Sequence, residues 1–256
     1  MKWKLVVKFV LLVVLILPLI CSGRAFAGQE LIVSAAASLT NAFPEIGEKF
    51  EAANPGVKVV FNFAASGPLL QQIESGAPVD LFASADQKTM DQADSKKLIL
   101  ADTRKNFVSN QLVLILPIDS KVKATGPPEL TAKGVVKIAI GNPETVPAGR
   151  YAQEALSNEG LWDALKPKLI NGESVRQVLD YVSRGEVDAG FVFSTDAAVA
   201  KDKVRVAAVM EKLKPITYPI AVVAATEKKE LAQRFIVYIL NGEGEAILSK
   251  YGFGKP

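Results

Sequence analysis

Short apolar segments alternate with amphipathic segments along the first part of this chain, and this alternation constrains the fold more than any other feature. Apolar or β-branched runs typical of buried strands lie at 30–36, 57–63 and 80–84. A stretch with helical spacing follows each of them, the first marked by Leu39, Ala42, Phe43, Ile46 and Phe50. This repeated β-α order predicts a mainly parallel sheet covered by helices.

A second block of the same kind is predicted at about 118–209. Its main helices are expected at 146–160 and 173–185, where Ser174 stands as an N-cap and Gly185 as a stop. The strands between them are again short and apolar. Two α/β blocks in one chain indicate two lobes, each built on its own sheet.

Two long apolar segments, 110–117 and 216–225, are placed to run between the blocks. The predicted first lobe is 28–108 plus 217–256, and the predicted second lobe is 109–216. In open α/β sheets, ligands bind beyond the carboxyl ends of the strands. We therefore expect a ligand site in the cleft between the lobes.

The N-terminus has the layout of a secretory signal peptide, predicted to span 1–27. A basic start is followed by an apolar run at 9–20, and small residues end at Ala27. A membrane-spanning helix needs about 20 apolar residues, so a retained anchor is the weaker interpretation. We expect cleavage near Ala27 and a protein located in the periplasm or outside the cell envelope.

Cys21 is the only cysteine, and it lies within the predicted signal segment. A cysteine after an apolar run raises the alternative of a lipid anchor. Ile20 stands before it, where a lipidation site wants a small residue, and this disfavours the anchor. Cleavage after Ala27 would leave no thiol for a disulfide or a metal.

Charge and composition exclude several classes of function. The signal segment holds four basic residues (Lys2, Lys4, Lys8 and Arg24) and no acid, so cleavage would take the net charge from +3 to −1. No basic run indicates a nucleic-acid partner. The chain has no histidine, which excludes Ser-His-Asp and Cys-His catalysis and imidazole metal sites. The sequence also has no P-loop, nucleophile elbow or dinucleotide motif, and it therefore does not favour an enzyme.

Two acids, Asp80 and Asp86, flank the predicted strand 80–84 and raise the possibility of a metal site. We interpret them instead as a strand-end acid and a helix cap.

Four predicted strand-to-helix turns present small residues or hydroxyls, two in each block: Ser38, Ser66, Ala148-Gly149 and Ser174-Val175. A helix N-terminus carries unpaired N–H groups and a partial positive charge, and small residues let an anion approach. A serine before a helix is commonly only an N-cap. The recurrence at four turns, with charge only at the flanking Glu173 and Arg176, favours a site of neutral donors for a small oxyanion.

The absence of an acid at the tips of these turns also discriminates between anions. Hydrogen phosphate carries an O–H that needs an acceptor, and an unpaired buried donor costs about 1–3 kcal/mol. Fully ionised, sulfate-like anions are therefore favoured over phosphate.

Several segments together resemble the periplasmic molybdate-binding proteins of bacterial ABC importers. They are AAASLTNAFPEIGEKFE (35–51), FAASGPLLQQIESGAPVDLFASADQKTMD (63–91), VPAGRYAQEAL (146–156) and ESVRQVLDYVSRGEVDAGFVFSTDA (173–197). The resemblance implies a two-lobed type II solute-binding protein, a monomer without cofactor, that holds molybdate or tungstate in its cleft. It also implies an inner-membrane permease and its ATPase as partners.

The resemblance further implies which residues contact the anion. The two ligand serines fall on Ser38 and Ser66, and the backbone donors fall on Ala148 and Val175. These same residues are the implied metal contacts, and they reach the molybdenum or tungsten only through the oxygens of the anion. The ligand tyrosine of the family falls on Phe193, which has no hydroxyl, so Ser194 or a water is the candidate substitute. Another tetrahedral oxyanion, such as sulfate, stays open as the alternative ligand.

Overall fold

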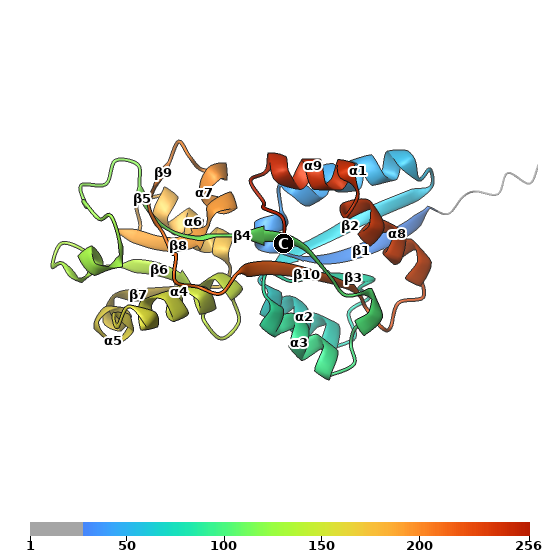
Figure 1. Cartoon of the computed structure of the whole chain (residues 1–256), viewed down its shortest axis with the longest axis horizontal. Helices are drawn as coiled ribbons and strands as arrows, with labels where there is room; N and C mark the ends of the chain where they lie inside the picture. Colours follow the sequence, from blue (N-terminus) through green and yellow to red (C-terminus); the bar gives the residue numbers. More distant parts are fainter. Residues whose placement is uncertain (1–27) are drawn as a thin grey trace, which may run out of the picture.

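The computed structural model describes residues 28–256, so the predicted signal segment 1–27 and Cys21 lie outside the described residues. Two five-stranded mixed sheets, each flanked by helices, lie side by side along the long axis of the molecule (Figure 1). The predicted two-lobed α/β architecture is confirmed.

The first sheet has the strand order β2-β1-β3-β10-β4, in which β10 is antiparallel to both neighbours and β1 is parallel to both of its own. Its strands are β1 (Gln29–Ala36), β2 (Val57–Ala64), β3 (Leu81–Ala83), β4 (Lys105–Asn110) and β10 (Ile216–Val222). Its helices are α1 (Ala42–Ala53), α2 (Ser66–Glu74), α3 (Gln87–Ser95), α8 (Lys229–Ile239) and α9 (Gly242–Lys250), with 3₁₀ turns η1 (Ala37–Leu39) and η2 (Ala101–Thr103).

The second sheet has the order β7-β6-β8-β5-β9, in which β5 is antiparallel to β8 and β9 and β6 is parallel to β7 and β8. Its strands are β5 (Leu112–Pro117), β6 (Ile138–Gly141), β7 (Leu169–Gly172), β8 (Ala189–Phe193) and β9 (Val204–Val209). Its helices are α4 (Pro147–Asn158), α5 (Trp162–Leu165), α6 (Val175–Ser183) and α7 (Ser194–Val199), with 3₁₀ turns η3 (Pro127–Thr131) and η4 (Lys166–Lys168).

The connection between the lobes differs from the expected single strand at 110–117. Two strands replace it: β4 belongs to the first sheet and β5 to the second, with Gln111 between them. Most of β4 was not predicted, because its sequence KNFVSN is half polar, as suits the edge of a sheet. Figure 1 shows β4 and β10 lying together at the junction of the lobes. The bounds 28–108 plus 217–256 and 109–216 stay our proposal for the lobes.

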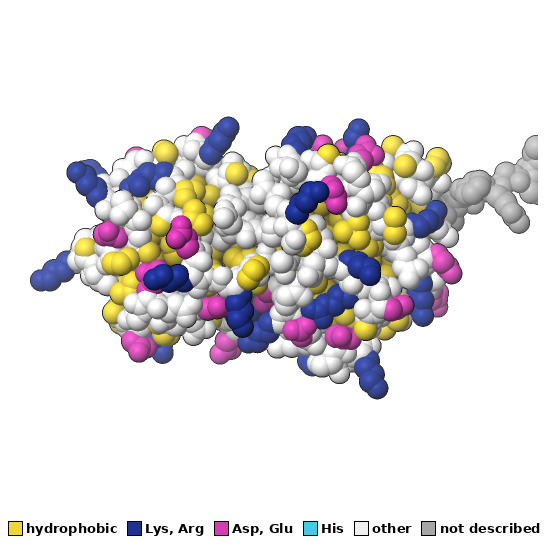
Figure 2. All heavy atoms as spheres, viewed as in Figure 1, with side chains coloured by type: hydrophobic (Ala, Val, Ile, Leu, Met, Phe, Trp, Pro, Cys, Tyr) yellow, Lys and Arg dark blue, Asp and Glu magenta, His cyan; other side chains and the backbone are white. Residues whose placement is uncertain are grey.

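Each lobe packs its helices on its sheet through buried apolar side chains. In the first lobe, Phe50 of α1 meets Phe235 of α8 edge-on, with ring centroids 5.0 Å apart. In the second lobe, Val178 and Val182 of α6 lie fully buried against the sheet. Acidic and basic side chains are interspersed over both lobes on the face shown in Figure 2. Within residues 28–256, no helix has the length and apolar character needed to cross a membrane.

Candidate functional site

A small cavity of about 10 Å³, roughly the space of one water molecule, lies between the two lobes. This is smaller than the roughly 300–1,000 Å³ of pockets that hold drug-sized ligands. Small and apolar residues dominate its lining: Ala36, Ala37, Ser38, Ala65, Ser66, Ala85, Val146, Pro147, Ala148, Val175 and Phe193. The structure therefore brings all five residues expected at the site to one cavity.

Ser38 lies in the middle of the 3₁₀ turn η1, between β1 and α1, and is 2% exposed. We expected it to open the helix, but α1 begins at Ala42 and the Ser38 side chain caps no helix. Its Oγ lies 3.0 Å from the hydroxyl of Tyr218 on β10. The N-cap interpretation is wrong for Ser38, whose hydroxyl contacts another side chain at the edge of the cavity.

Ser66 is the first residue of α2 and is fully buried. The N-cap is Ala65, which has no side-chain cap, so Ser66 is not a cap either. Its Oγ accepts a hydrogen bond from the backbone N–H of Ala85 at 3.0 Å. Because a backbone N–H can only donate, the Ser66 hydroxyl proton remains free for a further acceptor.

The second lobe contributes two helix starts to the cavity. Ala148 is the second residue of α4, whose N-cap Val146 makes no side-chain bond. Val175 is the first residue of α6, and the predicted N-cap Ser174 is confirmed: its Oγ accepts from the N–H of Gln177 at 3.2 Å. N–H groups of a first helical turn have no partner within the helix. Ala148 and Val175 therefore present backbone donors beside side chains that are apolar.

Close packing brings the start of α4 to the cavity. A Cβ added to Gly149 would lie 1.9 Å from the carbonyl oxygen of Gly141, at the end of β6. Glycine is thus the residue that lets the first turn of α4 approach the strand end so closely.

Phe193, the last residue of β8, lines the cavity and is 1% exposed. Its ring packs against Tyr218 and Tyr151, with centroids 5.7 and 6.3 Å away. Ser194 does not replace the missing hydroxyl, because its Oγ donates to Asn110 Oδ1 at 2.9 Å and the residue does not line the cavity. The expectation that Ser194 substitutes for the missing tyrosine hydroxyl is therefore wrong.

The lobes are closed on each other by polar contacts that cross the cleft. Arg150 of α4 places Nε 2.8 Å and Nη2 2.6 Å from Asp86 Oδ2, and both side chains are largely buried. Nη2 also donates to Thr89 Oγ1 at 2.7 Å. Beside them, the N–H of Gly67 donates to the Thr145 carbonyl at 3.0 Å. These contacts hold the first turns of α2, α3 and α4 together.

A second arginine pairs within its own lobe. Arg176 of α6 donates from Nε to Asp196 Oδ1 at 2.6 Å, and its Nη2 reaches the Ser38 carbonyl at 3.4 Å. Asp196 is fully buried and its Oδ2 has no partner among residues 28–256. Burial raises the pKa of Asp196 to about 6, and the Arg176 charge opposes this rise. Because each arginine near the cavity is matched by an acid, the donors that line the cavity are neutral.

Neither Asp80 nor Asp86 belongs to a metal site in the described part of the chain. Asp86 caps α3 by accepting from the N–H of Thr89 at 3.1 Å, as expected. Asp80 accepts from the N–H of Ile32 at 2.7 Å and from Lys228 Nζ at 3.1 Å. Among residues 28–256, no three or more Asp, Glu, Cys or His side chains cluster as metal ligands would.

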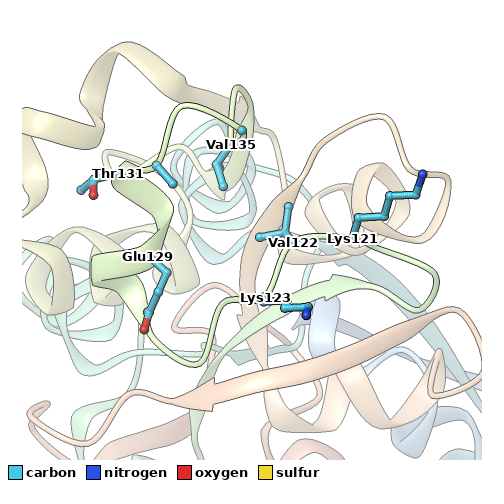
Figure 3. Close-up of a pocket in the computed structure, with 8 residues that line it drawn as sticks. Lys121, Val122, Lys123, Glu129, Thr131 and Val135 are labelled. Atoms are coloured by element: carbon cyan, nitrogen blue, oxygen red, sulfur yellow. The ribbon is translucent and has the colours of Figure 1, made fainter.

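A larger hollow lies on the surface of the second lobe, between the segments 121–123 and 129–135 (Figure 3). Glu129 lies on the opposite side of it from Lys121 and Lys123, so its charged groups do not converge. The interlobe cavity, where donors converge, is the stronger candidate for a binding site.

Sequence reasoning missed several residues that shape the cavity. Arg150 and Asp86 are 64 positions apart, and Tyr218 is 180 positions from Ser38. No local pattern links such positions. The only available signal was the spacing of Arg150, which follows Ala148 by two residues and therefore lies in the same first turn of α4.

The sequence and the fold are both similar to those of known proteins. Residues 31–254 match the family described as bacterial extracellular solute-binding protein. The molybdate-binding protein ModA of Escherichia coli (strain K12) is 42% identical, over 91% of this chain and 92% of the relative.

Two solved structures are similar over most of the chain. The substrate-binding domain of a putative molybdenum ABC transporter from Clostridium difficile is 44% identical, with a TM-score of 0.68, over 89% of this chain and 99% of that one. The periplasmic molybdate-binding protein of Azotobacter vinelandii is 25% identical, with a TM-score of 0.78, over 88% and 99%. The chain therefore belongs to the family of bacterial extracellular solute-binding proteins.

Proposed function

We propose that this chain is the receptor that captures molybdate, and also tungstate, for a bacterial ABC importer. One observation carries the proposal: two serine hydroxyls and two helix starts converge on one small cavity between the lobes, and the neighbouring Arg150 and Arg176 are each paired with an acid. The names of the similar proteins support molybdate as the ligand rather than sulfate. As a family member, the chain is a solute-binding protein and not an enzyme, and its anion is a ligand rather than a cofactor.

The proposed binding sites are the hydroxyls of Ser38 and Ser66 and the backbone N–H groups of Ala148 and Val175, with Phe193 closing one side. Neutral donors suit a dianion because they stabilise its charge without an accompanying counter-ion. Their number also matches a tetrahedral anion, whose oxygens each need hydrogen bonds once water is removed.

Binding and closure are coupled in this proposal. In an open form, the anion meets Ser38 and Ser66 of the first lobe. Closure then adds Ala148 and Val175 from the second lobe, and the same movement brings Arg150 to Asp86. Because the anion contacts both lobes only in the closed form, it shifts the equilibrium towards that form.

Selection against phosphate follows from the lining of the cavity. No carboxylate lines it, so the O–H of hydrogen phosphate would be buried without an acceptor. That mismatch costs about 1–3 kcal/mol, which corresponds to roughly 5- to 150-fold in affinity.

The partners and the location follow from the same role. We propose that the closed receptor acts as a monomer and docks on an inner-membrane permease whose ATPase drives transport. We propose export through the signal segment 1–27, with cleavage near Ala27, to the periplasm or the exterior of the cell envelope. Retention by a lipid at Cys21 is the alternative, and mass spectrometry of the exported protein distinguishes the two.

Calorimetric titration of residues 28–256 tests the ligand. We expect strong binding of molybdate and tungstate, weaker binding of sulfate, and no detectable binding of phosphate. Perchlorate, a tetrahedral anion with a single charge, serves as the control for charge and should not bind. No heat with any of these anions would contradict the proposal, and tight sulfate binding without molybdate binding would replace it with the sulfate alternative.

A further inference from the structure

The two cavity serines share a feature that points to a residue outside the cavity lining. Ser66 Oγ accepts from the N–H of Ala85, so its own proton is free to point into the cavity. Ser38 Oγ has no such backbone donor among its described contacts; its partner is the hydroxyl of Tyr218, 3.0 Å away. The orientation of the Ser38 proton therefore depends on which of these two hydroxyls donates.

Tyr218 is held rigidly at this position. It lies on β10, at the junction of the lobes, and is fully buried. Its ring packs edge-on against Phe107, Phe193 and Phe253, with centroids 5.7–6.3 Å away. A hydroxyl fixed in this way has few possible partners, and both of them are visible in the structure: Ser38 and Asn110.

Asn110 sets the direction of the hydrogen bonds. Its Oδ1 accepts from the backbone N–H of Gln111 at 2.9 Å, which fixes which end of the amide is oxygen. The Nδ2 end must then face Tyr218, and it donates to the Tyr218 hydroxyl oxygen at 3.2 Å. Tyr218 thus receives one hydrogen bond, and its own proton is available for Ser38 Oγ.

The same amide connects the lobes. Asn110 Nδ2 also donates to Thr195 Oγ1 at 2.9 Å, and Oδ1 accepts from Ser194 Oγ at 2.9 Å. Thr195 and Ser194 belong to α7 of the second lobe. A continuous line of hydrogen bonds therefore runs from the second lobe through Asn110 and Tyr218 to Ser38 in the first.

Given the proposed function, we infer that Tyr218 is a positioning residue for oxyanion binding: it donates to Ser38 Oγ and so directs the Ser38 proton to the anion. Tyr218 does for Ser38 what the N–H of Ala85 does for Ser66. Burial raises the pKa of Tyr218 well above its ordinary value, so the phenol keeps its proton at any physiological pH.

This role extends to specificity. With its oxygen occupied by the Tyr218 proton, Ser38 is a donor and a poor acceptor. Without Tyr218 the Ser38 oxygen is free to accept from a protonated anion. Loss of the tyrosine hydroxyl should therefore weaken binding of molybdate and reduce the discrimination against hydrogen phosphate.

A double-mutant cycle tests the inference. Molybdate affinity is measured for residues 28–256 in the wild type, in Tyr218→Phe, in Ser38→Ala and in the double variant. We expect Tyr218→Phe to lower affinity about tenfold in the wild-type background and less than twofold in the Ser38→Ala background, because the tyrosine acts through the serine. The ratio of molybdate to phosphate affinity should fall in Tyr218→Phe.

The control variant is Tyr238→Phe, whose hydroxyl contacts Glu243 on the surface, and which should bind as the wild type does. A second variant, Asn110→Asp, keeps the side-chain volume and replaces the donor facing Tyr218 with an acceptor; it should also lower affinity at least tenfold. Thermal unfolding of the ligand-free variants establishes that they are folded.

The outcomes separate this inference from the proposed function. Wild-type protein that binds no oxyanion overturns both. Wild-type protein that binds molybdate, with unchanged affinity in Tyr218→Phe or in Asn110→Asp, overturns the inference alone. An equal loss from Tyr218→Phe in both backgrounds also overturns it, since the tyrosine would then act independently of Ser38.

Discussion

The two walls of the cavity present hydrogen-bond donors in different ways. The first lobe uses side chains: Ser38 and Ser66 offer hydroxyls whose oxygens already have partners in the same lobe. The second lobe uses the backbone: Ala148 and Val175 offer first-turn N–H groups, and their side chains are apolar.

This difference separates two kinds of mutational sensitivity. On the first wall, removing one hydroxyl removes one donor and leaves the fold largely intact. On the second wall, no side-chain truncation removes a donor, and only a change that moves the helix start can do so. The following predictions test that contrast, from the largest expected effect to the smallest.

Gly149→Ala should have the largest effect, because it displaces a donor of the second wall. The new Cβ would meet the Gly141 carbonyl oxygen at 1.9 Å, and backbone atoms cannot rotate away. We expect α4 to shift away from β6. The free energy of unfolding should fall by about 1–3 kcal/mol, and molybdate affinity should fall more than about 100-fold. Denaturant unfolding and calorimetry measure the two effects.

Gly134→Ala is the matched control, since a Cβ there meets nothing within 4 Å. It should change the free energy of unfolding by less than about 0.5 kcal/mol and leave affinity unchanged. Wild-type affinity in Gly149→Ala would show that the start of α4 does not contact the anion.

Arg150→Met should have the next largest effect, because Arg150 joins the walls. Its loss leaves Asp86 buried without its cation in the closed form, whereas we expect water to reach Asp86 in the proposed open form. We expect molybdate affinity to fall about 30- to 100-fold, or about 2–3 kcal/mol, with little change in the unfolding of the ligand-free protein. Calorimetry gives the affinity, and small-angle scattering with molybdate gives the closure.

The exposed Arg184, whose contact with Glu186 is 3.9 Å long, provides the control Arg184→Met. An affinity within threefold of the wild type in Arg150→Met would mean that the ion pair does not favour closure.

Ser66→Ala and Val175→Ala compare the two walls directly. Ser66→Ala removes a donor and leaves the N–H of Ala85 without its partner, so affinity should fall about 10- to 30-fold. Val175→Ala keeps its N–H, so affinity should change less than threefold while the free energy of unfolding falls by about 1–3 kcal/mol. The contrast between the walls fails if Val175→Ala loses as much affinity as Ser66→Ala.

Phe193→Tyr should have the smallest effect on molybdate affinity, and it should raise the affinity rather than lower it. It adds a hydroxyl at the position where the resemblance implies a ligand tyrosine, on a ring that already lines the cavity. We expect molybdate affinity to rise about 3- to 10-fold. Unchanged affinity would indicate that the edge of this ring does not point at the anion, and Tyr151→Phe is a control for the neighbouring ring.

Local patterns in the sequence were enough to predict most elements of both sheets. The alternation of apolar runs with helical spacing placed β1, β2 and β3, and the Ser174 cap and the Gly185 stop placed α6. Patterns failed where packing decides. The polar edge strand β4 has no alternation, and Ser38 and Ser66 looked like N-caps although neither is one.

The sequence by itself determined the two-lobed α/β fold, the small-residue turns and the five residues that meet at the cavity, because these follow from periodicity along the chain and from the resemblance. Only the tertiary structure decided which way the donors point. The partners of the serines and of Arg150 come from distant segments: Ala85 for Ser66, Tyr218 for Ser38 and Asp86 for Arg150. The first two contacts form within the first lobe and the third when the lobes close on each other, and local spacing in the sequence carries no record of any of them.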